Sequence, residues 1–331
     1  PPRTARAFTP FTRLFEEQAR RSPGAVAVRC GGDALTYAGL NGAANALAAR
    51  LRERGLGRGS AVAICLEPSI PWLVSALGVL KAGAAFVPVD PGDPAERQAF
   101  IVRNAASAAV IGGPHLAGLL PGDVVHLPVV EPADGAWPDP DGTVTAADAA
   151  YVIHTSGSTG VPKGVVVEHG GLASYLDWAN EALVGDVAVP ALSRPTFDAS
   201  LKQLLAPLAR GGTVWLLPPE TAADPAAIHA ALCEHPGPLA VNCVPSLWQA
   251  LLEAAASDRG DGLTGRLVRV LLGGEALPEP LAERIRELLP DVEIWNLYGP
   301  TEATANATAG PVVPGDRVTI GRPIAGTRVY L

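Results

Sequence analysis

The chain has 331 residues, of which 48% are hydrophobic and 18% charged, and its formal net charge is -8. This composition lies within the range of globular proteins and far from that of disordered chains, and the length allows one large domain or two coupled domains. The negative charge is spread without a long run of one sign, which argues against nucleic acid as a partner.

Short apolar strands alternate with helices from residue 11 to about residue 290. Strands are predicted at residues 25–30, 61–66, 85–89, 151–155, 213–217, 268–272 and 293–296. A core-facing helix that stops at Gly55 is predicted from apolar residues at helical spacing, which are Leu40, Ala43, Ala44, Leu47 and Leu51. The alternation predicts an α/β fold with mixed or parallel sheets flanked by helices.

Two changes in composition predict internal boundaries. Residues 132–145 are rich in Pro, Asp and Gly, as a surface loop between two lobes would be. After Gly310, prolines break up the apolar pairs and no helix is predicted. We therefore expect a first α/β subdomain at residues 1–145, a second at residues 146–310, and the start of a mostly β lobe at residues 311–331.

Cysteines and the amino terminus exclude further classes. Cys30, Cys65, Cys233 and Cys243 form no Cys-x-x-Cys pair, so neither a zinc site nor a disulfide framework is predicted. Residues 1–13 carry arginines but no apolar signal-peptide core, and no apolar run is long enough to span a bilayer. These features favour a cytoplasmic location without a membrane partner.

A loop rich in Gly, Ser and Thr follows the strand at residues 151–155. It reads Thr155-Ser156-Gly157-Ser158-Thr159-Gly160-Val161-Pro162-Lys163-Gly164. Glycines let backbone amides approach an anion, hydroxyls donate to its oxygens, and the lysine adds a positive charge. The loop is not a Walker A motif, because Pro162 precedes Lys163 and Gly164 follows it. Taken alone, the segment fits either a phosphate loop or a polar, flexible hairpin.

The loop resembles the phosphate-binding signature of the adenylate-forming superfamily, and other segments match that superfamily in order. Residues 35–40 (Leu-Thr-Tyr-Ala-Gly-Leu) and 80–91 (Leu-Lys-Ala-Gly-Ala-Ala-Phe-Val-Pro-Val-Asp-Pro) resemble the first two motifs of nonribosomal peptide synthetase adenylation domains. Residues 197–200 (Phe-Asp-Ala-Ser) and 296–302 (Asn-Leu-Tyr-Gly-Pro-Thr-Glu) resemble the fourth and fifth motifs. The chain thus resembles the amino-terminal core of such a domain, which implies a large α/β core and the start of a β-barrel lobe.

The resemblance implies that this core binds ATP and Mg²⁺ and activates an amino acid as its adenylate. Hydroxyls of the loop and Lys163 would surround the β- and γ-phosphates, and Thr301 would contact the α-phosphate. Glu302 would help to hold Mg²⁺, which prefers carboxylate oxygen. The implied catalytic group is Lys163, Thr301 and Glu302. The implied ATP-binding residues are Thr155, Ser156, Gly157, Ser158, Thr159, Gly160, Lys163, Gly273, Gly274, Asn296, Tyr298, Gly299 and Thr301.

The adenine base would lie against three of these segments. Asn296 offers an amide to the exocyclic amine, Tyr298 offers a ring for stacking, and Gly273-Gly274 offers a flat backbone on the other side. Each also has an ordinary structural interpretation, since Tyr298 would fit a core, Asn296 a strand cap, and Gly299-Pro300 a turn.

Asp198 separates amino-acid-activating domains from their relatives. In peptide synthetases the matching aspartate pairs with the α-ammonium group of the substrate, and ligases of fatty or aryl acids generally lack it. An aspartate before an apolar run is also a favoured helix N-cap. Both interpretations of Asp198 fit the sequence.

Aligning the motifs places a further set of side chains around the substrate: Asp198, Ala199, Lys202, Cys243, Leu271, Gly273, Leu297, Ala305 and Asn306. Lys202 stands out, because an ammonium group among Leu, Ala and Gly needs an anion to offset its desolvation. We expect an acidic substrate, Asp or Glu or a modified form such as 3-methylaspartate, with Asn306 adding a hydrogen bond. A solvent-facing lysine, or an internal pair with Asp198, would also account for Lys202.

Complete members of the superfamily continue with a ribose-binding aspartate, a hinge and a small lobe that carries a catalytic lysine. The 331 residues contain none of these segments, so we expect impaired catalysis by this segment alone. The resemblance implies transfer of the aminoacyl group to phosphopantetheine on a carrier domain, with an MbtH-like protein as a further partner. Two other functions stay open, an acyl- or aryl-acid ligase of the same superfamily and a noncatalytic nucleotide-binding core.

Overall fold

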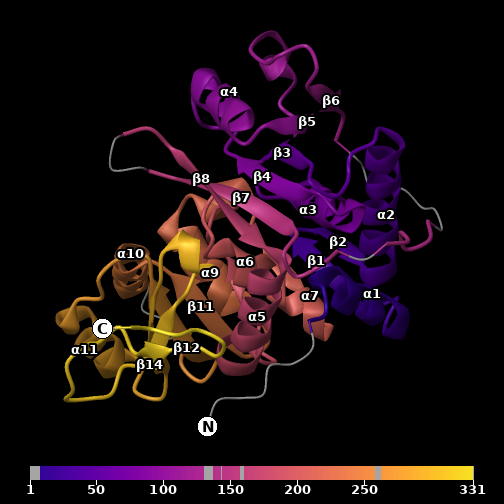
Figure 1. Cartoon of the computed structure of the whole chain (residues 1–331). Coiled ribbons are helices and arrows are strands. Elements are labelled where there is room, and N and C mark those ends of the chain that lie inside the picture. Colours follow the sequence, from indigo (N-terminus) through magenta and orange to yellow (C-terminus); the bar gives the residue numbers. More distant parts are fainter. Residues whose placement is uncertain (1–7, 130–136, 143, 157–159, 258–261, 331) are drawn as a thin grey trace.

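The computed structural model describes residues 8–129, 137–142, 144–156, 160–257 and 262–330, and Figure 1 shows their arrangement. Within these residues the strands form three sheets. The expected α/β class is confirmed, and no described helix is long and apolar enough to cross a membrane. The helices are α1 (Phe11–Arg21), α2 (Tyr37–Glu53), α3 (Ile70–Ala82), α4 (Ala95–Asn104), α5 (His169–Ala179), α6 (Ser200–Leu204), α7 (Ala206–Arg210), α8 (Pro219–Ala222), α9 (Pro225–Glu234), α10 (Pro245–Ser257) and α11 (Glu279–Leu288).

A six-stranded sheet, in the order β6-β5-β3-β4-β7-β8, occupies the upper part of Figure 1. Its strands are parallel except for β8, which folds back on β7 as a hairpin. Most of its central residues are buried apolar side chains, as parallel strands covered on both faces require. The strands are β3 (Ala61–Cys65), β4 (Ala85–Val89), β5 (Ser107–Gly112), β6 (Val125–Leu127), β7 (Ala149–Thr155) and β8 (Lys163–Glu168).

A five-stranded sheet, in the order β11-β12-β13-β14-β15, forms the lower part of the molecule with α10 and α11 beside it (Figure 1). β11, β12 and β13 run parallel, so their carboxyl ends meet at one edge. The strands are β11 (Leu239–Cys243), β12 (Leu267–Gly273), β13 (Glu293–Tyr298), β14 (Thr308–Pro311) and β15 (Arg322–Pro323). A third sheet joins β2 (Asp33–Thr36), β1 (Val26–Cys30), β10 (Val214–Leu216) and β9 (Pro190–Ala191).

Short helical segments and caps set the ends of several elements. Three segments are irregular or tight, namely η1 (Pro114–Gly118), the π-helix η2 (Asn180–Val184) and η3 (Thr301–Ala303). The side chain of Ser69 caps α3 by accepting a hydrogen bond from the Trp72 amide, and Gly83 ends that helix at a φ of 89°. Nearly every residue of α3 is buried, which is typical of a helix that is apolar all round.

The predicted strands all occur, with ends within two residues of the expected positions, and the predicted helix is α2, which ends at Glu53, two residues before Gly55. The boundaries at residues 145 and 310 have no counterpart in the sheets. In two of the described sheets, strands that precede residue 145 pair with strands that follow it. Residue 310 lies within β14, and β15 pairs with β14 in the same sheet. The division into lobes at these positions, including a β-barrel lobe, stays a prediction. The largest core cluster includes buried side chains from all three sheets, with members from Phe11 to Ile324 along the chain.

Candidate active site

The predicted phosphate loop joins β7 to β8. Thr155 ends β7 and lies opposite Lys163, which begins β8, so the loop closes an antiparallel hairpin. Ser156, Gly160 and Lys163 are exposed, and Gly160 has a φ of 79°, which favours glycine. Gly157, Ser158 and Thr159 lie outside the described residues. The described loop residues therefore present a hydroxyl and an ammonium group to solvent at the end of the hairpin.

Glycines keep the carboxyl edge of β12 and β13 open. Gly273 lies opposite Leu297, and a Cβ added to Gly273 would lie 2.7 Å from the Leu297 carbonyl oxygen. Gly274 follows with a φ of 85°. A side chain at Gly273 would therefore clash with backbone, and the flat surface expected beside the adenine depends on glycine there.

Asn296 and Tyr298 occupy the end of β13 beside these glycines. The Asn296 side chain is buried, and its Nδ2 donates to the Thr319 carbonyl oxygen at 2.8 Å. This bond orients the amide so that Oδ1 is the acceptor left for an amine, as the proposed adenine contact requires. The Tyr298 ring is 53% exposed, which contradicts its interpretation as a core residue.

Thr301 and Glu302 form η3 immediately after β13. Gly299 precedes them at a point where an added Cβ would lie 2.5 Å from the Ala307 nitrogen, so the chain turns too tightly for any side chain. Thr301 is half-buried, Glu302 is exposed, and η3 contacts β8. The predicted α-phosphate and Mg²⁺ residues thus lie next to the strand that carries Lys163.

The described residues contain no group of three or more His, Cys, Asp or Glu side chains that would hold a metal ion. A single exposed carboxylate at Glu302 nevertheless fits Mg²⁺, which takes one or two protein carboxylates and completes its coordination with phosphates and water.

Asp198 lies in the turn before α6 and does not cap that helix. The N-cap position belongs to Ala199, and no side chain makes a capping hydrogen bond there. The Asp198 carboxylate is partly buried, and its charge acts on Lys202 and on the hydroxyls of Tyr151 and Tyr175. The structure therefore disfavours the N-cap interpretation and places a carboxylate within a partly apolar cluster.

Lys202 is buried, with 2% of its surface exposed. Burial lowers the pKa of its ammonium group from 10.5 to about 8, and the nearby charge of Asp198 opposes that change. Among the described residues no hydrogen bond or ion pair within 4.0 Å reaches Lys202. The solvent-facing interpretation of this lysine is wrong, and Asp198 acts on it at longer range than a direct ion pair.

The other predicted substrate residues are buried or half-buried. Leu271, Leu297 and Ala305 are buried in one core cluster with Tyr175. The Tyr175 hydroxyl donates to Oδ1 of Asn306 at 3.1 Å. Ala199 and Gly273 are half-buried. Sequence reasoning did not single out Tyr175, because a buried tyrosine on an amphipathic helix looks like an ordinary core residue.

Strand alternation separates Cys243 from this group. Asn242 lies opposite Leu271, and Cys243 lies opposite Leu272. Because successive side chains of a strand point to opposite faces, Asn242 shares the face of Leu271 and Gly273, whereas Cys243 does not. Cys243 packs instead with Leu272 in the second core cluster. We therefore replace Cys243 by Asn242 in the proposed substrate site.

Asn242 is held rigidly in this position. Its Nδ2 donates to the Leu271 carbonyl oxygen at 2.9 Å, and its Oδ1 accepts from Nε2 of Gln203 at 3.0 Å. The strand at residues 239–243 is buried along its whole length, so its sequence shows no alternation that would separate the face of Asn242 from that of Cys243.

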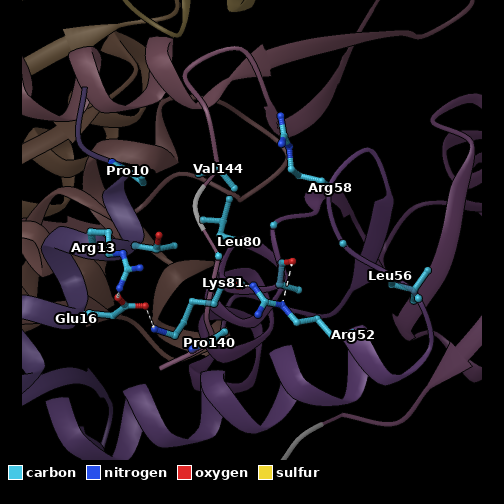
Figure 2. Close-up of a pocket in the computed structure, with 16 residues that line it drawn as sticks. Pro10, Arg13, Glu16, Arg52, Leu56, Arg58, Leu80, Lys81, Pro140 and Val144 are labelled. Atoms are coloured by element: carbon cyan, nitrogen blue, oxygen red, sulfur yellow. Dashed lines mark hydrogen bonds and ion pairs between the residues drawn. The ribbon is translucent and has the colours of Figure 1, made fainter. Parts of the chain in front are cut away.

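A cavity of about 350 Å³ lies elsewhere, between α1 and the carboxyl ends of α2 and α3 (Figure 2). Lys81 points from α3 toward Glu16 of α1, with an Nζ to Oε1 distance of 2.5 Å, and its Nζ lies 3.4 Å from Asp139. Arg52 donates to the Lys81 carbonyl oxygen at 3.0 Å. The charged side chains of Lys81, Glu16 and Asp139 thus pair with one another, and these contacts link the helices beside the cavity to residues 137–142. None of the predicted site residues lines it.

Comparison with known proteins agrees with this arrangement. The model of the AMP-binding enzyme family matches residues 15–331. Tyrocidine synthase 3 of Brevibacillus parabrevis is 39% identical over 96% of this chain and 5% of its own length. Phosphinothricin tripeptide synthetase PhsB of Streptomyces viridochromogenes is 38% identical over 96% of this chain and 27% of its own. The chain thus spans a small part of these relatives.

Solved structures of the nonribosomal peptide synthetase FmoA3 share the fold. Its AMPPNP-bound form superposes with a TM-score of 0.87 at 30% identity, over 98% of this chain and 35% of the other. A form with bound alpha-methyl-L-serine-AMP gives the same TM-score at 29% identity, over 98% of this chain and 37% of the other. On the extent of the family match, the chain belongs to the AMP-binding enzyme family.

Proposed function

We propose that the chain activates an amino acid with ATP, giving an aminoacyl-adenylate and pyrophosphate. One observation carries the proposal: Asp198 and the buried Lys202 place opposite charges in one cluster that is otherwise largely apolar. An amino acid with an acidic side chain offers the complementary pair, an ammonium group for Asp198 and a carboxylate for Lys202. Membership of the AMP-binding family and the synthetase relatives support the reaction class.

In this reaction a carboxylate oxygen of the substrate bonds to the α-phosphorus, and the bond from that phosphorus to the β-phosphate bridge oxygen breaks. Two anions must approach, so the protein has to offset their repulsion and align them. We assign Ser156, Ser158, Thr159 and Lys163 to the β- and γ-phosphates. Thr301 is assigned to the α-phosphate.

Glu302 would hold Mg²⁺, which would neutralise phosphate charge when bound. Asn296 and Tyr298 would bind the adenine beside Gly273. The exposed Tyr298 ring and the free Oδ1 of Asn296 support this assignment.

Lys202 supports the narrower proposal that the substrate is acidic, namely Asp, Glu or a modified form such as 3-methylaspartate. An ammonium group buried without an ion pair among the described residues is unfavourable, and a substrate carboxylate offsets that cost. A carrier domain with its phosphopantetheine thiol is the proposed acceptor of the aminoacyl group, and an MbtH-like protein is a proposed further partner.

Amino-acid-dependent ATP–pyrophosphate exchange tests the proposal, with the protein at its natural length and every common amino acid plus 3-methylaspartate. Exchange is expected with acidic amino acids. Lys202→Ala should remove it for these substrates, and Asp198→Asn should lower exchange with any amino acid, because every one carries the α-ammonium group. Exchange with apolar amino acids only would contradict the acidic substrate, and adenylation of acyl or aryl acids alone would contradict amino-acid activation.

A further inference from the structure

A buried hydrogen bond fixes the orientation of the Asn306 side chain. The Tyr175 hydroxyl donates to Oδ1 of Asn306 at 3.1 Å, and the two side chains are 2% and 7% exposed. An amide carries one acceptor oxygen and one nitrogen with two donors. Because the tyrosine hydroxyl occupies the oxygen, the NH₂ group is the part of Asn306 left to meet a ligand.

The backbone turn before Asn306 packs against α5, the helix that carries Tyr175. Gly171 and Tyr175 are four residues apart on α5 and therefore share a face. A Cβ added to Gly171 would lie 2.9 Å from Oγ1 of Thr304, so glycine allows the turn to approach the helix closely. Thr304 and Ala305 have φ values of 60° and 68°, a conformation that non-glycine residues adopt only when the surrounding structure holds them. The helix thus positions both the turn and the amide.

Lys202 belongs to the same cluster. Helix α6, which carries Lys202, contacts α5, which carries Tyr175, and the Asp198 carboxylate just before α6 acts electrostatically on both side chains. Lys202 has three N–H donors and no acceptor. Among the described residues no hydrogen bond or ion pair satisfies its ammonium group. Lys202 and Asn306 therefore offer N–H donors to a ligand and no acceptor.

We propose that Tyr175 is a positioning residue that fixes the NH₂ group of Asn306 toward the substrate, so that Asn306 and Lys202 select a side-chain carboxylate and discriminate against a carboxamide. This inference rests on the proposed amino-acid activation and deepens it. Both oxygens of a carboxylate accept hydrogen bonds. A carboxamide in the same place has only one acceptor oxygen, so its NH₂ group faces an N–H donor of Lys202 or Asn306, or one of these donors is left without an acceptor. This mismatch weakens binding of the carboxamide relative to the carboxylate.

The discriminating quantity is the ratio of kcat/KM for an acid to that for its amide. It is measured by ATP–pyrophosphate exchange for aspartate against asparagine and for glutamate against glutamine. We expect the better pair to favour the acid by at least about a hundredfold, because two donors are involved, one of them charged. Tyr175→Phe frees the amide to rotate, and the ratio should fall about tenfold while the KM for ATP stays unchanged.

Two further variants make the test specific. Tyr37→Phe is the matched control, because Tyr37 is equally buried and its hydroxyl also donates a hydrogen bond, at 2.7 Å to the Gly212 carbonyl oxygen, but on α2. It should leave the ratio within about twofold of the parent value, since no predicted site residue takes part in that bond. Asn306→Asp keeps the acceptor for Tyr175 and replaces the NH₂ group by an oxygen, so it should shift preference toward the amide by at least about tenfold.

The outcomes separate this inference from the proposed function. Exchange with acids together with an unchanged ratio in Tyr175→Phe would overturn the role of Tyr175 and leave amino-acid activation standing. Absence of exchange with every amino acid would overturn the proposed function itself. If Tyr175→Phe does not fold, an unchanged ratio in Asn306→Asp would overturn the selection by Asn306 on which the role of Tyr175 depends.

Discussion

Two buried lysines should respond in opposite ways to the same substitution. Lys81 is held by Glu16 and Asp139, whereas Lys202 has no ion pair within 4.0 Å among the described residues. Removing Lys81 takes the buried cation away from Glu16, which keeps only its ion pair with the partly exposed Arg13. Removing Lys202 relieves a desolvated charge. We therefore expect Lys81→Met to destabilise the protein and Lys202→Met to stabilise it at pH 7.

The magnitude for Lys202 follows from its pKa. Burial lowers that pKa from 10.5 to about 8, and about 1.4 kcal/mol per pKa unit gives a cost of about 3 kcal/mol for keeping the charged form. Below pH 8 the lysine is protonated in the folded and unfolded states, so the full cost is present. Between pH 8 and 10.5 the unfolded state binds more protons, and the free energy of unfolding rises with pH. The advantage of Lys202→Met should therefore shrink from pH 8 upward.

Urea unfolding of the parent and both variants at pH 7 and at pH 10 measures these differences. For Lys81→Met a loss of up to roughly 3–5 kcal/mol in the free energy of unfolding is expected, as for other broken buried ion pairs, reduced by the ion pair that Glu16 keeps with Arg13. A gain of up to about 3 kcal/mol is expected for Lys202→Met at pH 7, reduced by the packing that methionine loses. Equal destabilisation by the two substitutions would refute the argument that Lys202 is unpaired.

Three further predictions concern the site directly. Gly273→Ala should lower the rate of ATP–pyrophosphate exchange at least about tenfold, because the added Cβ would clash with backbone atoms. Gly24→Ala is the control and should leave that rate unchanged, because no atom lies within 4 Å of the added Cβ. Asn242→Ala should alter the order of preferred amino acids, and Cys243→Ser should not. Exchange rates with a panel of amino acids measure that order, and a change caused by Cys243→Ser alone would contradict the prediction. The KM for an acidic amino acid should rise as the pH increases through about 8, where Lys202 loses its proton. The rise should reach up to about tenfold per pH unit, while the KM for ATP stays unchanged. A KM for the acidic amino acid that is constant from pH 7 to 9 would exclude contact with Lys202.

Local pattern predicted the strands of the parallel sheets well, because buried parallel strands are short apolar runs bounded by Gly or Pro. Aligning the motifs also placed Asp198 and Lys202 in one set, and the charge of Asp198 acts on Lys202 in the structure. It failed at Cys243, where the choice between neighbouring residues of a strand depends on which face meets the cluster. It also missed Tyr175, since its bond to Asn306 joins residues 131 positions apart. Such contacts follow from packing and leave no local signal.

The contrast between the two lysines also bears on how the site works. At Lys81 the chain supplies Glu16 and Asp139 as counter-ions for a buried ammonium group, and the cavity beside that network contains none of the predicted site residues. At Lys202 a charge of the same kind is equally buried, yet the carboxylate whose charge acts on it, Asp198, is the one proposed to bind the substrate's own ammonium group. A ligand that carries both charges would satisfy both residues at once. A neutral side chain would leave Lys202 desolvated and unpaired, so the cost already present in the free protein becomes discrimination against neutral substrates.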